Sequence, residues 1–249
     1  MSFDLNSLVK DWPHESGSIK VRKIMGLDGR EKLQLRIDLG LLQMEMEGRP
    51  DGQRPHNAES LLAYHQGRAA RAEERGETYQ LTPEQCAELQ QEGIQYYHRY
   101  LSLFQINDFL GVIRDTQRNL ELFNFVITHT EREDVVWSFQ QFRPYVIMMN
   151  TRAKASIFLG EGKFAEAMKE IERGRDTITE FFQQSNFPEL AQKSSELAFL
   201  EEWLEEVSSK RPLSKLEIMQ REMETAIAKE LYERAAELRD AIKLLKAGK

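Results

Sequence analysis

From Thr82 to the C-terminus, apolar residues recur at helical spacing, with few glycines or prolines to interrupt them. Apolar residues three or four positions apart lie on one face of an amphipathic helix. The start signals agree: Thr82 to Gln85 (TPEQ) combines a threonine N-cap, a proline at the first helical position and a glutamine three residues after the cap. Thr130 to Glu133 and Ser214 to Glu217 repeat this capping-box spacing. The pattern predicts helices over residues 83–106, 108–128, 131–160, 163–184, 187–208, 214–228 and 231–246.

The first eighty residues follow a different pattern. Ile19, Val21 and Ile24 precede the turn sequence Gly26-Leu27-Asp28-Gly29, and apolar and polar residues alternate again from Leu33 to Ile37 and from Leu42 to Met46. Alternation on both sides of a Gly/Asp turn is typical of a β-hairpin. We therefore expect a small antiparallel sheet over residues 18–48, followed by a helix over 57–76. The predicted fold class is mainly α with a small N-terminal antiparallel β-sheet (α+β).

Three regions are predicted: a small β-sheet region with its following helix at 1–80, a helical bundle at 81–208, and a helical hairpin at 213–247. The polar segment Ser208 to Pro212 ends in proline and is the best candidate for a linker. Within the bundle, Tyr96–Phe109 and Ala153–Phe164 each end a helix, turn and restart on phenylalanine. This echo resembles a tetratricopeptide helix pair, although its 55-residue separation differs from the 34-residue repeat. An ordinary antiparallel bundle is the alternative.

Composition limits the classes of function. Hydrophobic residues make up 41% and charged residues 30%, and no apolar run reaches the roughly 18 residues of a membrane helix. The N-terminus lacks the features of a secretion signal, and a single cysteine excludes an internal disulfide and a multi-cysteine zinc site. We expect a cytoplasmic protein without a metal, a cofactor or a membrane partner.

The net charge of −7 disfavours general binding to nucleic acid, but residues 18–36 carry a local excess of positive charge. A nucleic-acid-binding accessory factor that uses these strands is therefore the alternative function. The turn-rich loop from Gly48 to His56 adds two arginines, and we favour its interpretation as a structured connection. The candidate anion-binding residues are Lys20, Arg22, Lys23, Lys32, Arg49 and Arg54.

The C-terminus carries the most informative pattern. Leu216, Met219, Met223 and Ala226 form one helical stripe, and a second runs from Leu231 through Ala235, Leu238 and Ile242 to Leu245. Two such helices with a short turn make an αα-hairpin, and the alanines let the helices approach closely. A hairpin of roughly 30 residues is too small for a self-sufficient core. It docks on the rest of the chain, pairs with a second copy, or awaits a partner.

The run from Met223 to Ile242, above all Tyr232-Glu233-Arg234-Ala235-Ala236-Glu237-Leu238-Arg239-Asp240, resembles the UVR motif. This motif ends the bacterial excinuclease B subunit, recurs in the C subunit, and occurs in certain Clp-type ATPases and in the activator of a bacterial protein-arginine kinase. The resemblance implies a protein–protein interaction hairpin without catalytic chemistry of its own. The partner-binding residues that it indicates are Met223, Ala226, Tyr232, Glu233, Ala235, Ala236, Arg239, Asp240 and Ile242. We expect Leu231 and Tyr232 to pack within the hairpin, although an exposed ring at Tyr232 would make a good binding hot spot. Arg239 and Asp240 are adjacent on a helix, so we expect them to point in different directions and not to pair well with each other.

The catalytic features of the proteins that carry this motif are missing: the sequence has neither a GxxxxGK[ST] phosphate loop nor paired CxxC zinc motifs. We expect no catalytic residue, with Cys86 as a structural thiol and His98 packed in the bundle. The favoured function is a non-enzymatic adaptor that binds a protein partner, or a second copy in a homodimer, through the hairpin. Its setting would be bacterial DNA repair (nucleotide excision) or Clp-type protein quality control. An effector-binding regulator with a pocket between the sheet and the bundle is a third class.

Overall fold

The computed structural model describes residues 4–185, 188–213 and 215–247. It confirms the predicted class, because the chain is 67% helical and carries a small three-stranded antiparallel sheet near its N-terminus. The chain divides into two compact units, Met1–Leu204 and Glu205–Lys249. The predicted division into three regions stays a prediction.

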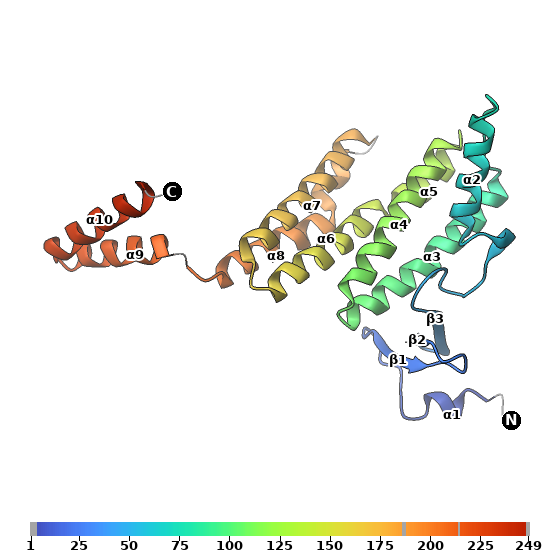
Figure 1. Ribbon diagram of the computed structural model, residues 1–249, viewed down its shortest axis with the longest axis horizontal. Coiled ribbons are helices and arrows are strands. Elements are labelled where there is room, and N and C mark those ends of the chain that lie inside the picture. Colours follow the sequence, from blue (N-terminus) through green and yellow to red (C-terminus); the bar gives the residue numbers. More distant parts are fainter. Residues whose placement is uncertain (1–3, 186–187, 214, 248–249) are drawn as a thin grey trace. The chain divides into compact units, whose positions relative to one another are not determined.

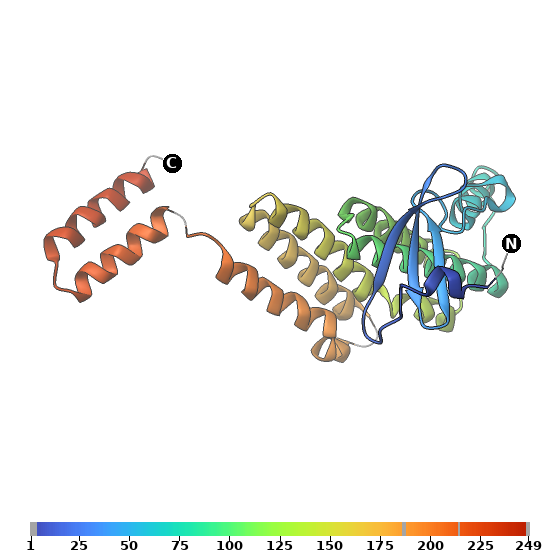
Figure 2. The ribbon, with the colours of Figure 1, turned by 90° about the horizontal axis from the view of Figure 1, so that it is seen from below.

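The sheet consists of β1 (Lys20–Met25), β2 (Glu31–Ile37) and β3 (Gly40–Glu45), in the order β1-β2-β3 and antiparallel throughout. Figure 2 shows the three strands side by side. Leu33 and Leu35 of β2 are buried, and Leu33 pairs with the buried Met44 of β3. The alternation in the sequence therefore places one apolar face inward, and the sheet packs on α3. A short helix, α1 (Asn6–Val9), precedes the sheet and was not predicted.

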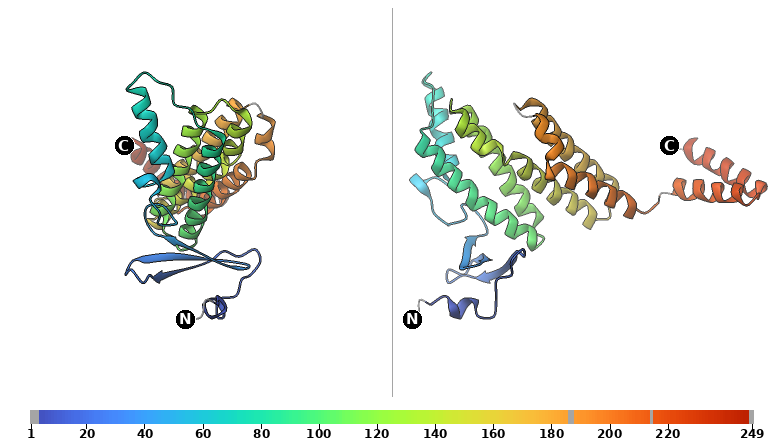
Figure 3. Two further views of the ribbon diagram at one scale, coloured as in Figure 1. Left: turned by 90° about the vertical axis from the view of Figure 1, so that its right-hand side faces the viewer. Right: turned by 180° about the vertical axis from the view of Figure 1, so that it is seen from behind.

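Figures 1 and 3 show the helices of the first unit. They are α2 (Leu61–Glu73), α3 (Pro83–Gln105), α4 (Phe109–Thr128), α5 (Glu133–Gln140), α6 (Arg143–Gly160), α7 (Phe164–Gln184) and α8 (Ser195–Lys210), which extends past Leu204, with 3₁₀ turns η1 (Pro55–Asn57) and η2 (Pro188–Lys193). The capping box at Thr82 is confirmed, since the Thr82 hydroxyl accepts a hydrogen bond from Gln85 N and Gln85 Oε1 accepts one from Thr82 N. None of the described helices is long and apolar enough to cross a bilayer.

The single helix predicted over 131–160 is wrong, because the structure divides it into α5 and α6. Pro144 lies in the first turn of α6, where its missing N–H costs nothing; inside a continuous helix it would remove a hydrogen bond and clash with the preceding turn. The capping box predicted at Thr130 is also wrong. Helix α5 begins after Arg132, and the Thr130 hydroxyl accepts a hydrogen bond from Arg132 N instead. The linker predicted at Ser208 is shorter than expected, because α8 continues to Lys210.

Two helical hairpins, α3–α4 and α6–α7, turn in the same way. After α3, Asn107 has a φ of 60°, its N–H bonds to Phe104 O, and the next N–H bonds to Leu103 O. After α6, Gly162 has a φ of 71° and makes the equivalent bonds to the last turn. Both are Schellman motifs, in which a left-handed residue closes the helix, and asparagine and glycine are the residues that adopt this conformation most readily. The tetratricopeptide-like character of these pairs stays a prediction.

Small residues allow α6 and α7 to approach closely. Ala153, Ala155 and Ala167 are fully buried. Gly174 of α7 lies so near α6 that a Cβ atom there would be 2.1 Å from the Thr151 hydroxyl oxygen. The short helix separation therefore depends on residues without bulk at these positions.

A buried ion-pair network fixes the loop after β3 to the bundle. Arg99 of α3, only 1% exposed, makes two hydrogen bonds to the fully buried Asp115 of α4, with lengths of 2.6 and 2.8 Å. The same guanidinium donates to the carbonyl oxygens of Glu45 and Gly48. The loop from Gly48 to His56 is thus a structured connection, held by charge-assisted hydrogen bonds.

Candidate partner-binding hairpin

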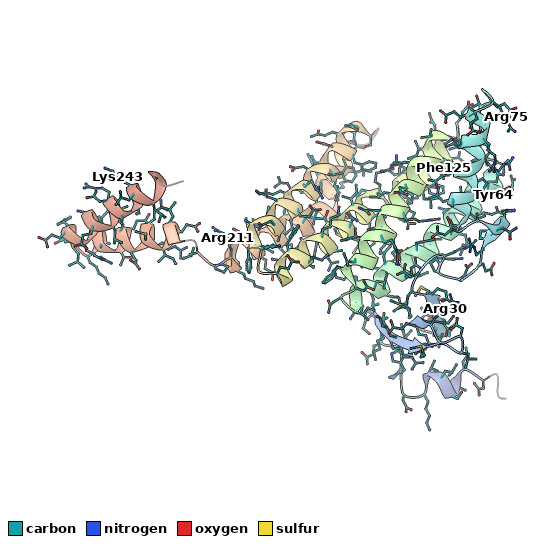
Figure 4. All side chains as sticks on the ribbon, in the orientation of Figure 1. Arg30, Tyr64, Arg75, Phe125, Arg211 and Lys243 are labelled. Atoms are coloured by element: carbon teal, nitrogen blue, oxygen red, sulfur yellow. The ribbon has the colours of Figure 1, made fainter. Side chains whose placement is uncertain are left out.

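The second unit contains the predicted hairpin, formed by α9 (Lys215–Ala228) and α10 (Tyr232–Ala247). Figure 4 shows the side chains that project from both helices, with Lys243 on α10. The seam between the helices buries Ala226 of α9 against α10, which contributes Ala235, Leu238 and Ile242. Met223 and Ala236 are half-buried beside them. The apolar stripes predicted from the sequence therefore face each other. The capping box predicted at Ser214 lies outside the described residues.

The turn of this hairpin is a third Schellman motif. Leu231 N bonds to Ala226 O at 2.8 Å, and Glu230 N bonds to Ile227 O at 3.0 Å. Glu230 occupies the left-handed position with a φ of 58°, where the other two hairpins have asparagine and glycine. A left-handed conformation costs an ordinary L-residue roughly 1–2 kcal/mol. The turn is therefore ordered by hydrogen bonds but strained at Glu230.

Large apolar side chains are exposed at this turn. Leu231 is 54% exposed, Tyr232 is 67% exposed, and Ile227 at the end of α9 is also exposed. Our expectation that Leu231 and Tyr232 pack within the hairpin is wrong. Both residues lie at the turn, beyond the seam residues Ala226 and Ala235, so neither helix covers them.

The charged candidates lie on α10. Glu233, Arg239 and Asp240 are exposed on α10. The expectation that Arg239 and Asp240 cannot pair is wrong, because Arg239 Nε donates to Asp240 Oδ1 at 3.0 Å. Long side chains can bend toward each other even from adjacent positions. This hydrogen bond, together with the charges of Arg239 and Lys243, lowers the pKa of Asp240. The pair is solvated, so its contribution to the stability of the fold is small.

The basic residues of the sheet are mostly paired with acidic partners. Lys20 contacts Glu15 at 2.6 Å and Lys23 contacts Glu31 at 3.3 Å, whereas Lys32 is bound by Glu45 and, at 3.0 Å, by Asp28. The hydrogen bonds that Lys32 donates to these two carboxylates raise its pKa. Arg22 stacks on the ring of Trp12 at 4.2 Å and donates to Gln34 Oε1. These lysines are therefore neutralised locally, which weakens their attraction for a polyanion.

The two arginines of the loop lie in different environments. Arg49 contacts Asp51 at 3.1 Å and the buried Glu92 at 3.6 Å. Glu92 also accepts hydrogen bonds from Leu61 N and Leu62 N, so its carboxylate caps the start of α2. Arg54 is exposed and precedes η1. Arg49 thus belongs to the network that anchors the loop, while Arg54 faces solvent.

Cys86 and His98 have the structural environments that the sequence indicated. Cys86 is 3% exposed, and burial raises the pKa of its thiol. Burial also lowers the pKa of His98. Among the described residues, histidine, cysteine and carboxylate side chains form no group of three suited to a metal ion.

Sequence reasoning missed Ile227 and Leu231 as surface residues of the hairpin, although both are more exposed than most of its candidates. The available signal was positional. Ile227 follows the last seam residue of α9 directly, and Leu231 precedes the first helical residue of α10, so both lie at the turn, where the facing helix ends. Apolar residues at the turn of an αα-hairpin are covered by neither helix.

The comparison with protein families supports the resemblance. The UVR family (UvrB/uvrC motif) matches residues 214–248, which include α9 and α10. Comparisons with characterised proteins and with solved structures find no match. The UVR motif occurs in UvrB and UvrC and in Clp-related proteins, and it mediates protein or DNA interactions. The C-terminal helical hairpin of this chain is a UVR motif.

Proposed function

We propose that this protein is a non-enzymatic adaptor that binds another protein through its UVR hairpin. The observation that carries the proposal is the exposure of Leu231 and Tyr232 at a turn that hydrogen bonds hold in place. An exposed aromatic ring on an ordered backbone offers a large contact area at a small entropic cost, and tyrosine is enriched among residues that dominate binding energies.

The exposed charges of α10 suit the rim of an interface. Glu233 is adjacent to Tyr232, and Arg239 and Asp240 are exposed about two turns further along the helix. Charged side chains are typical of the polar rim of a protein interface. The occurrence of the UVR motif in UvrB, UvrC and Clp-related proteins supports bacterial nucleotide excision repair or Clp-type protein quality control as the setting, with a cytoplasmic location.

The state of the reactive side chains supports a role without catalysis. A thiol with a raised pKa stays protonated at neutral pH and is a poor nucleophile, which applies to Cys86. His65, 2% exposed, is bound to the Tyr79 hydroxyl at 2.6 Å, and burial lowers its pKa. Both groups are therefore used for packing. The pairing of Lys20, Lys23 and Lys32 with acids favours a protein partner over a nucleic acid.

Affinity capture from a lysate of the source organism tests this proposal. The full-length wild type is compared with a double variant, Leu231→Ser with Tyr232→Ser, and with a control, Leu39→Ser. Leu39 is 92% exposed between β2 and β3, so the control also removes an exposed apolar side chain. We expect specific proteins to be captured by the wild type and by the control, and lost from the double variant. Equal capture by all three proteins would contradict the proposal.

A second copy of the chain is one of the protein partners that the proposal includes. A symmetric pairing would cover the apolar groups of two hairpins with a single interface. Sedimentation equilibrium of the wild type and the double variant measures this directly. A concentration-dependent dimer in the wild type alone indicates self-association. If the wild type and the double variant are both monomeric, the partner of the hairpin is a different protein.

A further inference from the structure

An aromatic cavity of about 510 Å³ lies within the first unit. Helices α3, α4, α5 and α6, the segment between α5 and α6, and the first turn of α8 line it, so it differs in place from the pocket expected between the sheet and the bundle. Its volume falls in the range of small-molecule sites, which are roughly 300–1,000 Å³. The rings in its wall belong to Tyr97, Tyr100, Phe123, Phe139, Phe142 and Tyr145.

Tyr100 is the best buried of these residues. It is 1% exposed overall, and among the described residues its hydroxyl has no hydrogen-bond partner. Among the described residues, the side-chain atoms that lack a hydrogen-bond partner and are sealed from solvent are Arg49 Nε, Gln95 Oε1 and Arg118 Nε. The Tyr100 hydroxyl is not one of them, so it keeps some contact with open space. Because the side chain lines the cavity, its hydroxyl reaches the cavity space. A polar group held there without a protein partner favours a ligand that supplies one.

Two further tyrosines lie close to Tyr100. The ring of Tyr97 meets that of Tyr100 edge-on at 5.5 Å and lies 6.1 Å from the ring of Tyr145. Burial raises the pKa of both Tyr100 and Tyr145, so these hydroxyls stay neutral at physiological pH. The cavity thus combines π-faces with neutral oxygen acceptors.

Glu196 sets the charge of this cavity. Of the described residues that line it, Glu196 is the only charged one. The Ser194 hydroxyl donates to Glu196 Oε2 at 2.9 Å and so holds one oxygen of the carboxylate at the start of α8. Burial raises the pKa of Tyr145, and Tyr97 and Glu196 add to the increase, whereas Arg152, which does not line the cavity, opposes it. Glu196 and the three tyrosines line the same cavity.

We propose that this cavity binds a small organic cation, in which a protonated amine is attached to an apolar group. Aromatic faces attract cations through their quadrupoles, and an ammonium in a desolvated site gains roughly 2 kcal/mol or more from such a ring. Glu196 supplies the countercharge, and the hydroxyl of Tyr100 accepts an N–H bond. An anion of the same size would meet Glu196 and the negative faces of the rings. The site is independent of the UVR hairpin and adds a ligand-binding role to the adaptor.

Isothermal titration calorimetry of the full chain tests the proposal with three probes of similar shape: 2-phenylethylammonium, the neutral 2-phenylethanol and the anionic 3-phenylpropionate. We expect the cation to bind about tenfold more tightly than the alcohol, and the anion to bind more weakly than either. No detectable binding of the cation at millimolar concentration, or equal binding of the anion, would overturn the proposal.

Variants locate the binding site. Glu196→Gln should weaken the binding of the cation by about tenfold and leave the binding of the alcohol unchanged, because glutamine keeps the shape of the side chain and removes its charge. The matched control is Glu202→Gln, which changes an exposed carboxylate on the same helix outside the cavity. Tyr100→Phe should weaken the binding of the cation by roughly threefold, because it removes the hydroxyl that accepts the N–H bond. Thermal melting verifies that each variant is folded. Equal effects of Glu196→Gln and Glu202→Gln would place the cation elsewhere and refute the assignment.

Discussion

Replacement of Glu230 by glycine should stabilise the UVR hairpin. Glu230 is exposed and has a φ of 58°, so its side chain is not needed for packing, while its Cβ makes the left-handed conformation costly. This conformation costs an L-residue roughly 1–2 kcal/mol. Glycine gives back roughly 0.5–1 kcal/mol, because it loses more backbone entropy on folding. The net stabilisation that we expect for Glu230→Gly is about 0.5–1 kcal/mol.

Amide hydrogen exchange of the full chain measures this effect locally. The exchange of amides within α9 and α10 reports the opening of the hairpin, and a stabilisation of this size slows it by about two- to fivefold. Glu230→Asn is a second test, because asparagine tolerates the left-handed region without the flexibility of glycine. We expect it to slow exchange as well.

The reciprocal substitution, Gly162→Glu, provides the control. Gly162 has the equivalent position in the α6–α7 turn, with a φ of 71° and no atom within 4 Å of an added Cβ. It should destabilise the first unit by about the amount that Glu230→Gly gains, through backbone strain alone. If Gly162→Glu destabilises its turn while Glu230→Gly leaves exchange in the hairpin unchanged or faster, the strain attributed to Glu230 is refuted.

Four further substitutions test the packing, the buried ion pair and the dependence of stability on pH. Ala235→Leu should overpack the seam and destabilise the hairpin by roughly 1–3 kcal/mol, which amide exchange detects as faster exchange in α9 and α10. Arg239→Glu is the control, because it changes an exposed side chain and should leave exchange in these helices unaltered. Asp115→Ala leaves the buried Arg99 without its carboxylate and should cost about 3–5 kcal/mol in urea unfolding; a loss below about 1 kcal/mol would contradict the role given to this pair. His65 has a pKa lowered by burial, so the unfolded state binds more protons below its ordinary pKa of 6.5 and stability falls as the pH drops through that range. His65→Gln should therefore flatten the dependence of the melting temperature on pH between about 7 and 5, and an unchanged slope would show that other groups carry it.

The sequence predicts the elements well where one physical signal dominates. The period-two pattern around Gly26–Gly29 predicts the β-hairpin, and the stripes at Ala226, Ala235, Leu238 and Ile242 predict the seam of the UVR hairpin. It fails at residues 131–160, where apolar periodicity continues across the break and only Pro144 marks the start of a new helix.

Tertiary features of the chain were beyond this reasoning. Arg99 and Asp115 are of residue types that are mostly exposed in proteins, yet both are buried, because each satisfies the other and Arg99 also donates to backbone carbonyls. The tyrosines of the aromatic cavity come from α3 and α6, and spacing along the chain does not bring Tyr100 and Tyr145 together. The positive φ of Glu230 could not be predicted from the sequence either, because glycine and asparagine are the residues preferred at a left-handed helix end.

The apolar side chains that the hairpin leaves uncovered explain why it suits a partner. Its seam buries Ala226, Ala235, Leu238 and Ile242, whereas Leu231 and Tyr232 are exposed. Burial is worth about 25 cal/mol per Å² of apolar surface, so covering this leucine and this tyrosine offers a partner a gain that the hairpin alone does not realise. A protein that covers these two side chains binds the folded hairpin and not the unfolded one. It therefore stabilises the hairpin in proportion to its own affinity, and the strain at Glu230 lowers the stability that the hairpin has without a partner.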